Sequence, residues 1–203
     1  MKHSLATYLV IFISLATIFT SATFYIISPK PAQSYMGFGV YSQQGLQGYV
    51  PGNMTITPPQ TLNWNLTVAN RTGREQFIMV IVRIGNSTTF SPNVTSPATP
   101  LPELGRLDRF VSDGETSNIN FPWTVESTNQ TGSLVLLNLQ INGNSVSSCP
   151  SVVSCVGAVS GRDFRLIFEI WTFDLSTGSF QYGYPGEFAQ IGTWLQVWFS
   201  TSA

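Results

Sequence analysis

Charged residues are scarce in this sequence. They make up 9% of its 203 residues, and the formal net charge is −1, whereas they account for about 25% of a typical soluble domain. A protein that binds nucleic acid needs a basic surface that neutralises phosphates. The sequence has no such excess of basic residues, so we predict no nucleic-acid partner.

The residue types that carry most enzyme chemistry are also scarce. The single histidine, His3, precedes a long apolar segment, so no Ser-His-Asp or Cys-His arrangement is available further along the chain. Lysine occurs only at Lys2 and Lys30, which excludes a phosphate-binding glycine loop that ends in lysine. We therefore predict no catalytic residue and a protein that is not an enzyme.

Acidic residues offer two weaker possibilities. Asp108, Asp113 and Glu115 lie close together in the sequence, but they lack the spacing of a calcium-binding loop, and we interpret them as a solvated turn. A pair of carboxylates acting as a hydrolase stays a lower-ranked alternative. We predict no metal and no cofactor.

The chain has two cysteines, Cys149 and Cys155. Zinc would need further cysteine or histidine ligands, and the sequence has none in the same region. Two nearby cysteines outside the cytosol usually pair. We predict a disulfide bond between them.

The segment from Leu5 to Ile27 contains no charged residue. As a helix it would be roughly 34 Å long at about 1.5 Å per residue, enough to cross a hydrocarbon core of about 30 Å. We predict a transmembrane helix or signal-anchor at 5–27, a short cytoplasmic tail at 1–4 and a linker at 28–34. Prolines in the linker prevent the helix from continuing.

The alternative for the same segment is a cleavable signal peptide, cut near Ala22 after the sequence TSA. Under either interpretation residues 35–203 are exported. The predicted location is the cell membrane, crossed once, with the C-terminal domain outside; cleavage would make the protein secreted.

N-glycosylation triplets are more frequent than chance alone would give. Asn65 falls on the polar face of the alternating stretch TLNWNLTV, where a solvent-facing asparagine can carry a sugar. The candidate acceptors are Asn53, Asn65, Asn70, Asn86, Asn93 and Asn129.

Beyond the apolar segment, hydrophobic residues recur at every second position, which is typical of β-strands. The stretch QFIMVIVRI is apolar on both faces, as expected of a central strand. NRTGRE and DLSTGSFQY have the composition of hairpin turns. We predict an all-β domain over 35–203, an antiparallel immunoglobulin-like β-sandwich.

Two further local features give expectations. The Pro-rich stretch 87–105 is expected to cross from one sheet to the other or to lie over a sheet edge. Arg165 and Glu169 alternate onto the same face of a predicted strand, opposite its apolar face, and we expect an exposed ion pair that contributes about 0–1 kcal/mol.

Four segments resemble an uncharacterised archaeal membrane-protein family. LNWNLTVANRTGREQFIMVIVRIG is similar to its pair of core strands, PLPELGRLDRF to its Pro-rich crossover, and LIFEIWTFDLSTGSFQYG with WLQVWFS to its closing strands. The resemblance implies an archaeal envelope protein with an exported β domain. It supplies no activity and no catalytic residue.

These features together predict a membrane-anchored, glycosylated β-sandwich that acts as a non-enzymatic binding or scaffold component of the cell envelope. Its partners are the membrane, through residues 5–27, and other envelope proteins or copies of itself. The alternative is a subunit of an extracellular filament or surface layer that assembles by β-strand pairing.

Overall fold

The computed structural model describes residues 5–27, 34–186 and 189–202. The chain divides into two compact units, 1–33 and 34–203. The tail predicted at 1–4 and most of the linker predicted at 28–34 lie outside the described residues.

The first unit contains one helix, α1, at Leu5–Ile27, with the same bounds as the uncharged segment. The side chains described in α1 are those of residues 8–21 and 23. Among them are large apolar groups open to solvent, such as Phe12 at 73% and Phe19 at 77% exposure. Taken over the described residues alone, the chain has no helix with the length and hydropathy needed to cross a membrane.

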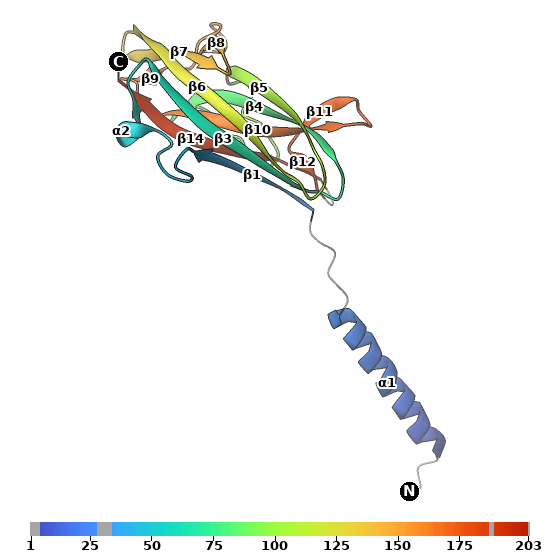
Figure 1. The fold of residues 1–203 in the computed structure, drawn as a ribbon. Helices are drawn as coiled ribbons and strands as arrows, with labels where there is room; N and C mark the ends of the chain where they lie inside the picture. Colours follow the sequence, from blue (N-terminus) through green and yellow to red (C-terminus); the bar gives the residue numbers. More distant parts are fainter. Residues whose placement is uncertain (1–4, 28–33, 187–188, 203) are drawn as a thin grey trace. The chain divides into compact units, whose positions relative to one another are not determined.

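The second unit consists of two β-sheets that face each other across a hydrophobic core (Figure 1). The first sheet has the order β1-β3-β6-β7-β8, with β9 beside β7, and the second has the order β2-β14-β10-β4-β5, with β11 beside β10. A small third pair joins β12 and β13. The elements are β1 Tyr35–Ser42, α2 Pro51–Met54, β2 Thr55–Ile56, β3 Gln60–Arg71, β4 Gln76–Asn86, β5 Glu103–Val111, β6 Thr116–Thr131, β7 Leu134–Ile141, β8 Asn144–Ser147, β9 Ala158–Val159, β10 Phe164–Asp174, β11 Ser179–Tyr182, β12 Tyr184–Pro185, β13 Gln190–Ile191 and β14 Thr193–Thr201.

Alternation in the sequence explains which face of each strand is buried. In β3 the side chains of Leu62, Trp64, Leu66 and Val68 are buried, whereas Asn65 between them is exposed. The central strands β4 and β10 are covered on both faces and are accordingly apolar along most of their length. The prediction of a mostly antiparallel, two-sheet β fold is confirmed; β14 with β2 is a parallel pair.

Aromatic rings from both sheets form the centre of the core. Trp64 lies 4.9 Å from Trp123 and 6.2 Å from Phe168, centroid to centroid. Phe121 in turn meets Phe168 edge-on at 5.2 Å. Because β3 and β6 belong to one sheet and β10 to the other, these rings join the two layers.

One of the two predicted hairpins is wrong. The connection 72–75 joins β3 in the first sheet to β4 in the second, so these consecutive strands are not paired. β4 pairs instead with β5 along one edge and with β10 along the other, so neither edge is open to β3. The other hairpin is confirmed, with Phe173 opposite Phe180 and Gly178 at a φ of 64°.

One expectation for the Pro-rich connection was that it crosses from one sheet to the other. This expectation is wrong for residues 87–102. The connection links β4 to its immediate neighbour β5 and makes hydrogen bonds to side chains on the outer face of that same sheet. Tyr182 donates from its hydroxyl to Asn93 O at 2.9 Å, for example. Burial, and secondarily the negative charge of Glu169, raises the pKa of Tyr182 above its ordinary range.

Cys149 and Cys155 lie at disulfide-bonding distance, with the two Sγ atoms 1.96 Å apart. We expect the double variant Cys149→Ser, Cys155→Ser to lose about 2.4 kcal/mol of unfolding free energy, because a ring of about seven residues then no longer restricts the unfolded chain. Urea unfolding of the full chain under oxidising conditions measures the loss. The wild-type chain under reducing conditions is the matched control and should show the same midpoint as the variant; a large gap between them would contradict the entropic explanation.

Candidate functional site

An apolar groove of about 580 Å³ lies at one end of the second sheet, where β4 begins and β5 and β10 end. Its walls come from three segments that are distant in the sequence. The residues that line the groove are Arg74, Glu75, Gln76, Phe77, Phe110, Phe173, Asp174, Leu175 and Ser176. We call this the phenylalanine groove.

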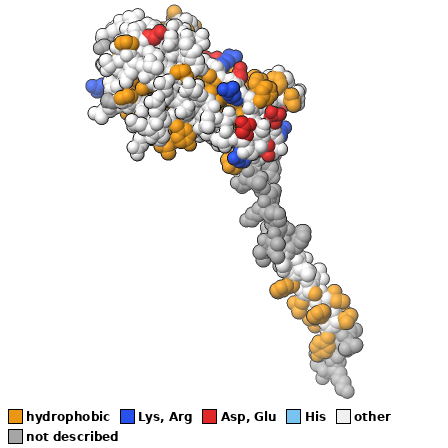
Figure 2. Space-filling view, in the orientation of Figure 1, with side chains coloured by type: hydrophobic (Ala, Val, Ile, Leu, Met, Phe, Trp, Pro, Cys, Tyr) orange, Lys and Arg blue, Asp and Glu red, His pale blue; other side chains and the backbone are white. Residues whose placement is uncertain are grey.

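Cross-strand pairing brings the aromatic rings of the groove together. Phe77 lies opposite Phe110 in the β4–β5 register, and their rings stack at 4.4 Å with planes 17° apart. Phe173 packs against Phe77 at 6.2 Å. Figure 2 shows hydrophobic side chains beside charged ones in the region where Figure 1 places β11. Phe110 is 65% exposed and Leu175 is 90% exposed, so these two side chains present an apolar surface to solvent.

The rim of the groove carries charges of both signs. Arg74 contributes a positive charge, and Glu75 and Asp174 contribute negative ones. Ser176 donates from its backbone N–H and its hydroxyl to Asp174, and these hydrogen bonds hold the pKa of the Asp174 carboxyl below its usual range. A rim with charges of both signs creates no strong field of one sign.

Asn70 braces the same end of the domain. Its Nδ2 donates to Arg74 O and to Val111 O, both at 2.8 Å, and its Oδ1 accepts from the backbone N–H and hydroxyl of Thr72. The two bonds from Nδ2 tie the connection 72–75 to the end of β5. The buried amide therefore fixes two of the three segments that line the groove.

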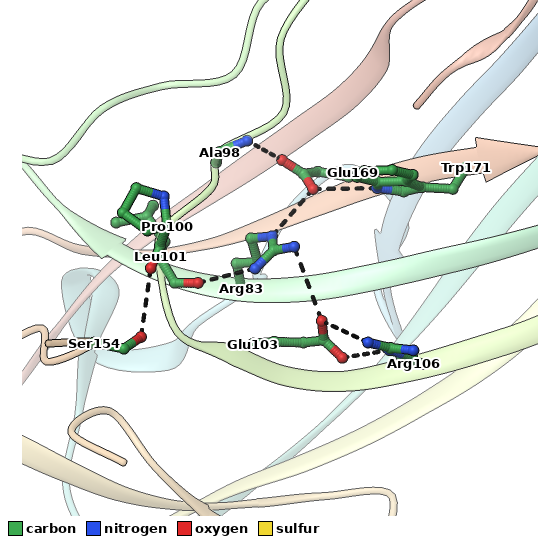
Figure 3. A network of polar contacts seen from close by, with 9 residues as sticks. All are labelled: Arg83, Ala98, Pro100, Leu101, Glu103, Arg106, Ser154, Glu169 and Trp171. Carbon is green, nitrogen blue, oxygen red and sulfur yellow. Dashed lines mark hydrogen bonds and ion pairs between the residues drawn. The ribbon is translucent and has the colours of Figure 1, made fainter. Parts of the chain in front are cut away.

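A buried ion pair lies farther along the outer face of the second sheet (Figure 3). Arg83 Nε donates to Glu169 Oε2 at 3.2 Å, and Arg83 Nη1 donates to Leu101 O at 2.9 Å. Glu169 also accepts from Ala98 N and from Trp171 Nε1. Because Ala98 and Leu101 belong to the connection 87–102, the pair fastens this connection onto the sheet.

The exposed Arg165–Glu169 pair expected from the sequence is wrong. Both residues are buried, at 2% and 0% exposure. Arg165 binds Thr89 O at 2.7 Å and Phe90 O at 2.9 Å, and burial lowers the pKa of its guanidinium. Alternation places both residues on the outer face correctly; the connection 87–102 then covers that face.

The hydrogen bonds of this buried network hold the connection 87–102 on the sheet, and they leave the Glu169 carboxylate no contact with solvent. Each carboxylate oxygen of Glu169 already accepts a hydrogen bond. Within residues 5–27, 34–186 and 189–202 no three acidic, histidine or cysteine side chains are grouped closely enough to hold a metal ion. The solvated turn predicted from Asp108, Asp113 and Glu115 is wrong for Asp108, which lies within β5 opposite Met79. Asp113 and Glu115 lie between β5 and β6, and Asp113 accepts from Gly73 N at 2.8 Å.

The candidate glycan acceptors fall into three environments. Asn53, Asn65, Asn93 and Asn129 are exposed. Asn86 is half-buried, and its Nδ2 donates to Gly157 O at 2.7 Å. Asn70 is fully buried, with Nδ2 committed to two carbonyl groups. A glycan attached to that nitrogen is incompatible with the folded domain.

Glycopeptide mapping of the protein from its own membranes provides a direct check of this division. We expect sugar on exposed acceptors such as Asn65 and Asn93, and none on Asn70, because a sugar there would displace both carbonyl partners. Variants Asn65→Gln and Asn93→Gln should each lower the intact mass by one glycan, whereas Thr72→Ala should leave it unchanged apart from the substitution. Occupied Asn70 in folded protein would contradict this assignment.

Sequence patterns did not reveal the phenylalanine groove. Its rings alternate onto the outer faces of three strands that are distant in the sequence, and no local pattern shows that Phe77, Phe110 and Phe173 meet. The available signal was the apolar character of both faces of QFIMVIVRI, which requires a cover on the outer side as well. The connection 87–102 covers one end of that face and leaves the end at Phe77 open.

Comparisons with known proteins do not assign the chain to a family. No protein-family model matches the sequence, and no curated protein matches it. Among solved structures, the crystal structure of Spo0M, a sporulation control protein from Bacillus subtilis, is similar with a TM-score of 0.35 and 6% identity. The aligned region covers 85% of this chain and 51% of that one, so the chain spans about half of its length.

Proposed function

We propose that this protein is a membrane-anchored, glycosylated, extracytoplasmic β-sandwich of immunoglobulin-like type that binds or scaffolds other components of the cell envelope without catalysing a reaction. The observation that carries this proposal is the phenylalanine groove. Exposed apolar patches with a polar rim are typical of protein-binding surfaces, and here rings such as Phe110 project from a domain that carries few charged residues.

The membrane anchor is supported by the sequence. Residues 5–27 contain no charge, and the run is long enough for a hydrocarbon core. Exported location is supported by the exposed N-glycosylation triplets and by the cysteine pair, since disulfides persist in oxidising compartments. A weakly charged surface rich in hydroxyl and amide groups is consistent with a glycosylated envelope protein.

A protein pull-down tests the binding function. Full-length protein, solubilised from its own membranes with a mild detergent, is expected to retain protein partners, and Phe110→Ser is expected to reduce their recovery at least tenfold. Val159→Ser is a matched control, because Val159 is 62% exposed and does not line the groove. Equal recovery of protein partners with both variants would show that the groove does not take part in binding.

Protease treatment of intact cells, followed by N-terminal sequencing, tests the topology. The proposal expects the domain at 35–203 to be cleaved from outside and the mature protein to begin at residue 1. A mature start near residue 23 would favour the secreted form, and resistance of the domain in intact cells would contradict export.

The second candidate function is a filament or surface-layer subunit assembled by strand pairing. The edge strand β1 favours it, because β1 is eight residues long, carries no charge and forms one border of the first sheet. An edge of this kind is a template for pairing with another chain. Long filaments that persist when Phe110→Ser is introduced would favour strand pairing over the groove.

A further inference from the structure

A second apolar feature projects from the domain at the disulfide. Residues 149–155, which we call the valine loop, place Val152 at 99% and Val153 at 91% exposure. The loop contains no charged residue. Two fully solvated neighbouring valines leave apolar surface in water, and its burial against another apolar surface would be favourable.

The valine loop is held firmly at its base. The disulfide closes it, Ser148 N donates to Leu137 O at 2.9 Å, and Val156 N donates to Ser148 O at 2.8 Å. Ser148 is fully buried, and its Oγ accepts from Leu137 N. A rigid base presents the two valines in a defined position and lowers the entropy lost when they bind.

The valine loop and the phenylalanine groove lie at opposite ends of β4. Gln76, at the start of β4, lines the groove, whereas Asn86, at its end, donates to Gly157 O just beyond the loop. Ten residue steps along a strand span roughly 33 Å. The loop of one molecule therefore cannot enter its own groove.

We propose that the valine loop of one copy inserts into the phenylalanine groove of the next copy. This inference rests on the proposed binding function and names its partner as a second molecule of the same chain. Both surfaces are apolar, and the groove of about 580 Å³ is larger than two valine side chains. An uncharged loop also meets no repulsion from a rim that contains both Arg74 and Glu75.

The geometry of such a contact determines the assembly. Loop and groove are different surfaces, so the contact is heterologous, and it produces rings or open chains instead of a closed two-fold dimer. One loop in one groove is a small interface, and small interfaces are weak. Anchoring of the copies in one membrane would raise their effective concentration and compensate for this weakness.

Two complementary variants test the contact in full-length protein in detergent micelles, followed by sedimentation velocity over a range of concentrations. Val153→Asp disables the loop, and Leu175→Asp disables the groove; both positions are highly exposed, so folding is preserved. The wild type is expected to form species larger than dimers as concentration rises, and each variant alone is expected to stay monomeric. Their equimolar mixture should form one-to-one dimers and nothing larger, because only one intact loop and one intact groove can meet.

Association that is unchanged in either variant, as pairing through α1 or β1 would give, overturns the proposal, as does a mixture that stays monomeric. A wild type that is monomeric at every concentration also overturns it.

Photocrosslinking identifies the occupant of the groove. With benzoylphenylalanine at position 110 of the otherwise wild-type chain in its own membranes, the expected product joins position 110 to a peptide of residues 148–157 from another copy. A product joining two groove peptides, or the groove to lipid, overturns the proposal. Crosslinks to a different envelope protein would contradict the contact between copies but agree with the proposed binding function. The absence of any crosslinked protein would contradict both proposals.

Discussion

Replacing Glu169 with alanine is expected to lower the free energy of unfolding by about 3–5 kcal/mol, because it leaves the Arg83 guanidinium buried without its counter-charge. Arg83 has an 8% exposed side chain, and Glu169 is fully buried. The variant also removes the acceptor of Ala98 N and Trp171 Nε1. Urea denaturation of the full chain at neutral pH, followed by tryptophan fluorescence, measures the difference.

Two companion variants separate the buried charge from general disruption. Glu103→Ala removes the longer, partly exposed contact to Arg83 at 3.9 Å, and it should cost no more than about 1 kcal/mol. The double variant Arg83→Met, Glu169→Met removes both charges and should recover much of the stability that Glu169→Ala loses. If the double variant were as unstable as Glu169→Ala, the hydrogen bonds to the connection 87–102 would outweigh the ion pair.

Replacing Asn70 with alanine is expected to cost about 1–3 kcal/mol, because it takes the Asn70 donor away from the buried carbonyl group of Val111, and such a loss costs about 1–3 kcal/mol. The carbonyl group of Arg74 also loses a donor but still accepts from the Thr72 hydroxyl at 3.2 Å. These carbonyl groups lie where β3 passes to β4 and where β5 ends. Urea unfolding measures the loss. Asn65→Ala is the matched control on the same strand, and with an exposed side chain it should change stability by less than about 0.5 kcal/mol.

The same variant connects stability to the groove. Because Asn70 ties the connection 72–75 to the end of β5, its removal should let Arg74 and Glu75 move and weaken binding in the phenylalanine groove even where the domain stays folded. Recovery of partners in the pull-down should therefore fall for Asn70→Ala at 10 °C and not for Asn65→Ala. Unchanged recovery would show that the groove does not depend on this brace.

The sequence alone determined the long strands other than β5 and the inner face of most of them, whereas β5 lies largely in the segment expected to be a Pro-rich crossover. Alternation in TLNWNLTV identified the buried side of β3, including Trp64, and it did so because successive side chains of a strand point to opposite faces. The two-faced apolar run at β4 correctly indicated a central strand. Local composition also identified the β10–β11 hairpin and the cysteine pair, since these features depend on residues close together in the chain.

Only the tertiary structure decided which strands became neighbours and what covered them. Alternation indicates which face of a strand is buried, but it does not indicate which strand is its neighbour. The turn after β3 was therefore predicted to form a hairpin, although it joins the two sheets. Arg83 and Glu169 are 86 positions apart, and their pairing depends on the register of β4 with β10 and on the connection 87–102 above them. The phenylalanine groove arises in the same way, where three distant segments end together beyond the reach of that connection. Burial of the outer face is a property of the whole fold, and no local pattern contains it.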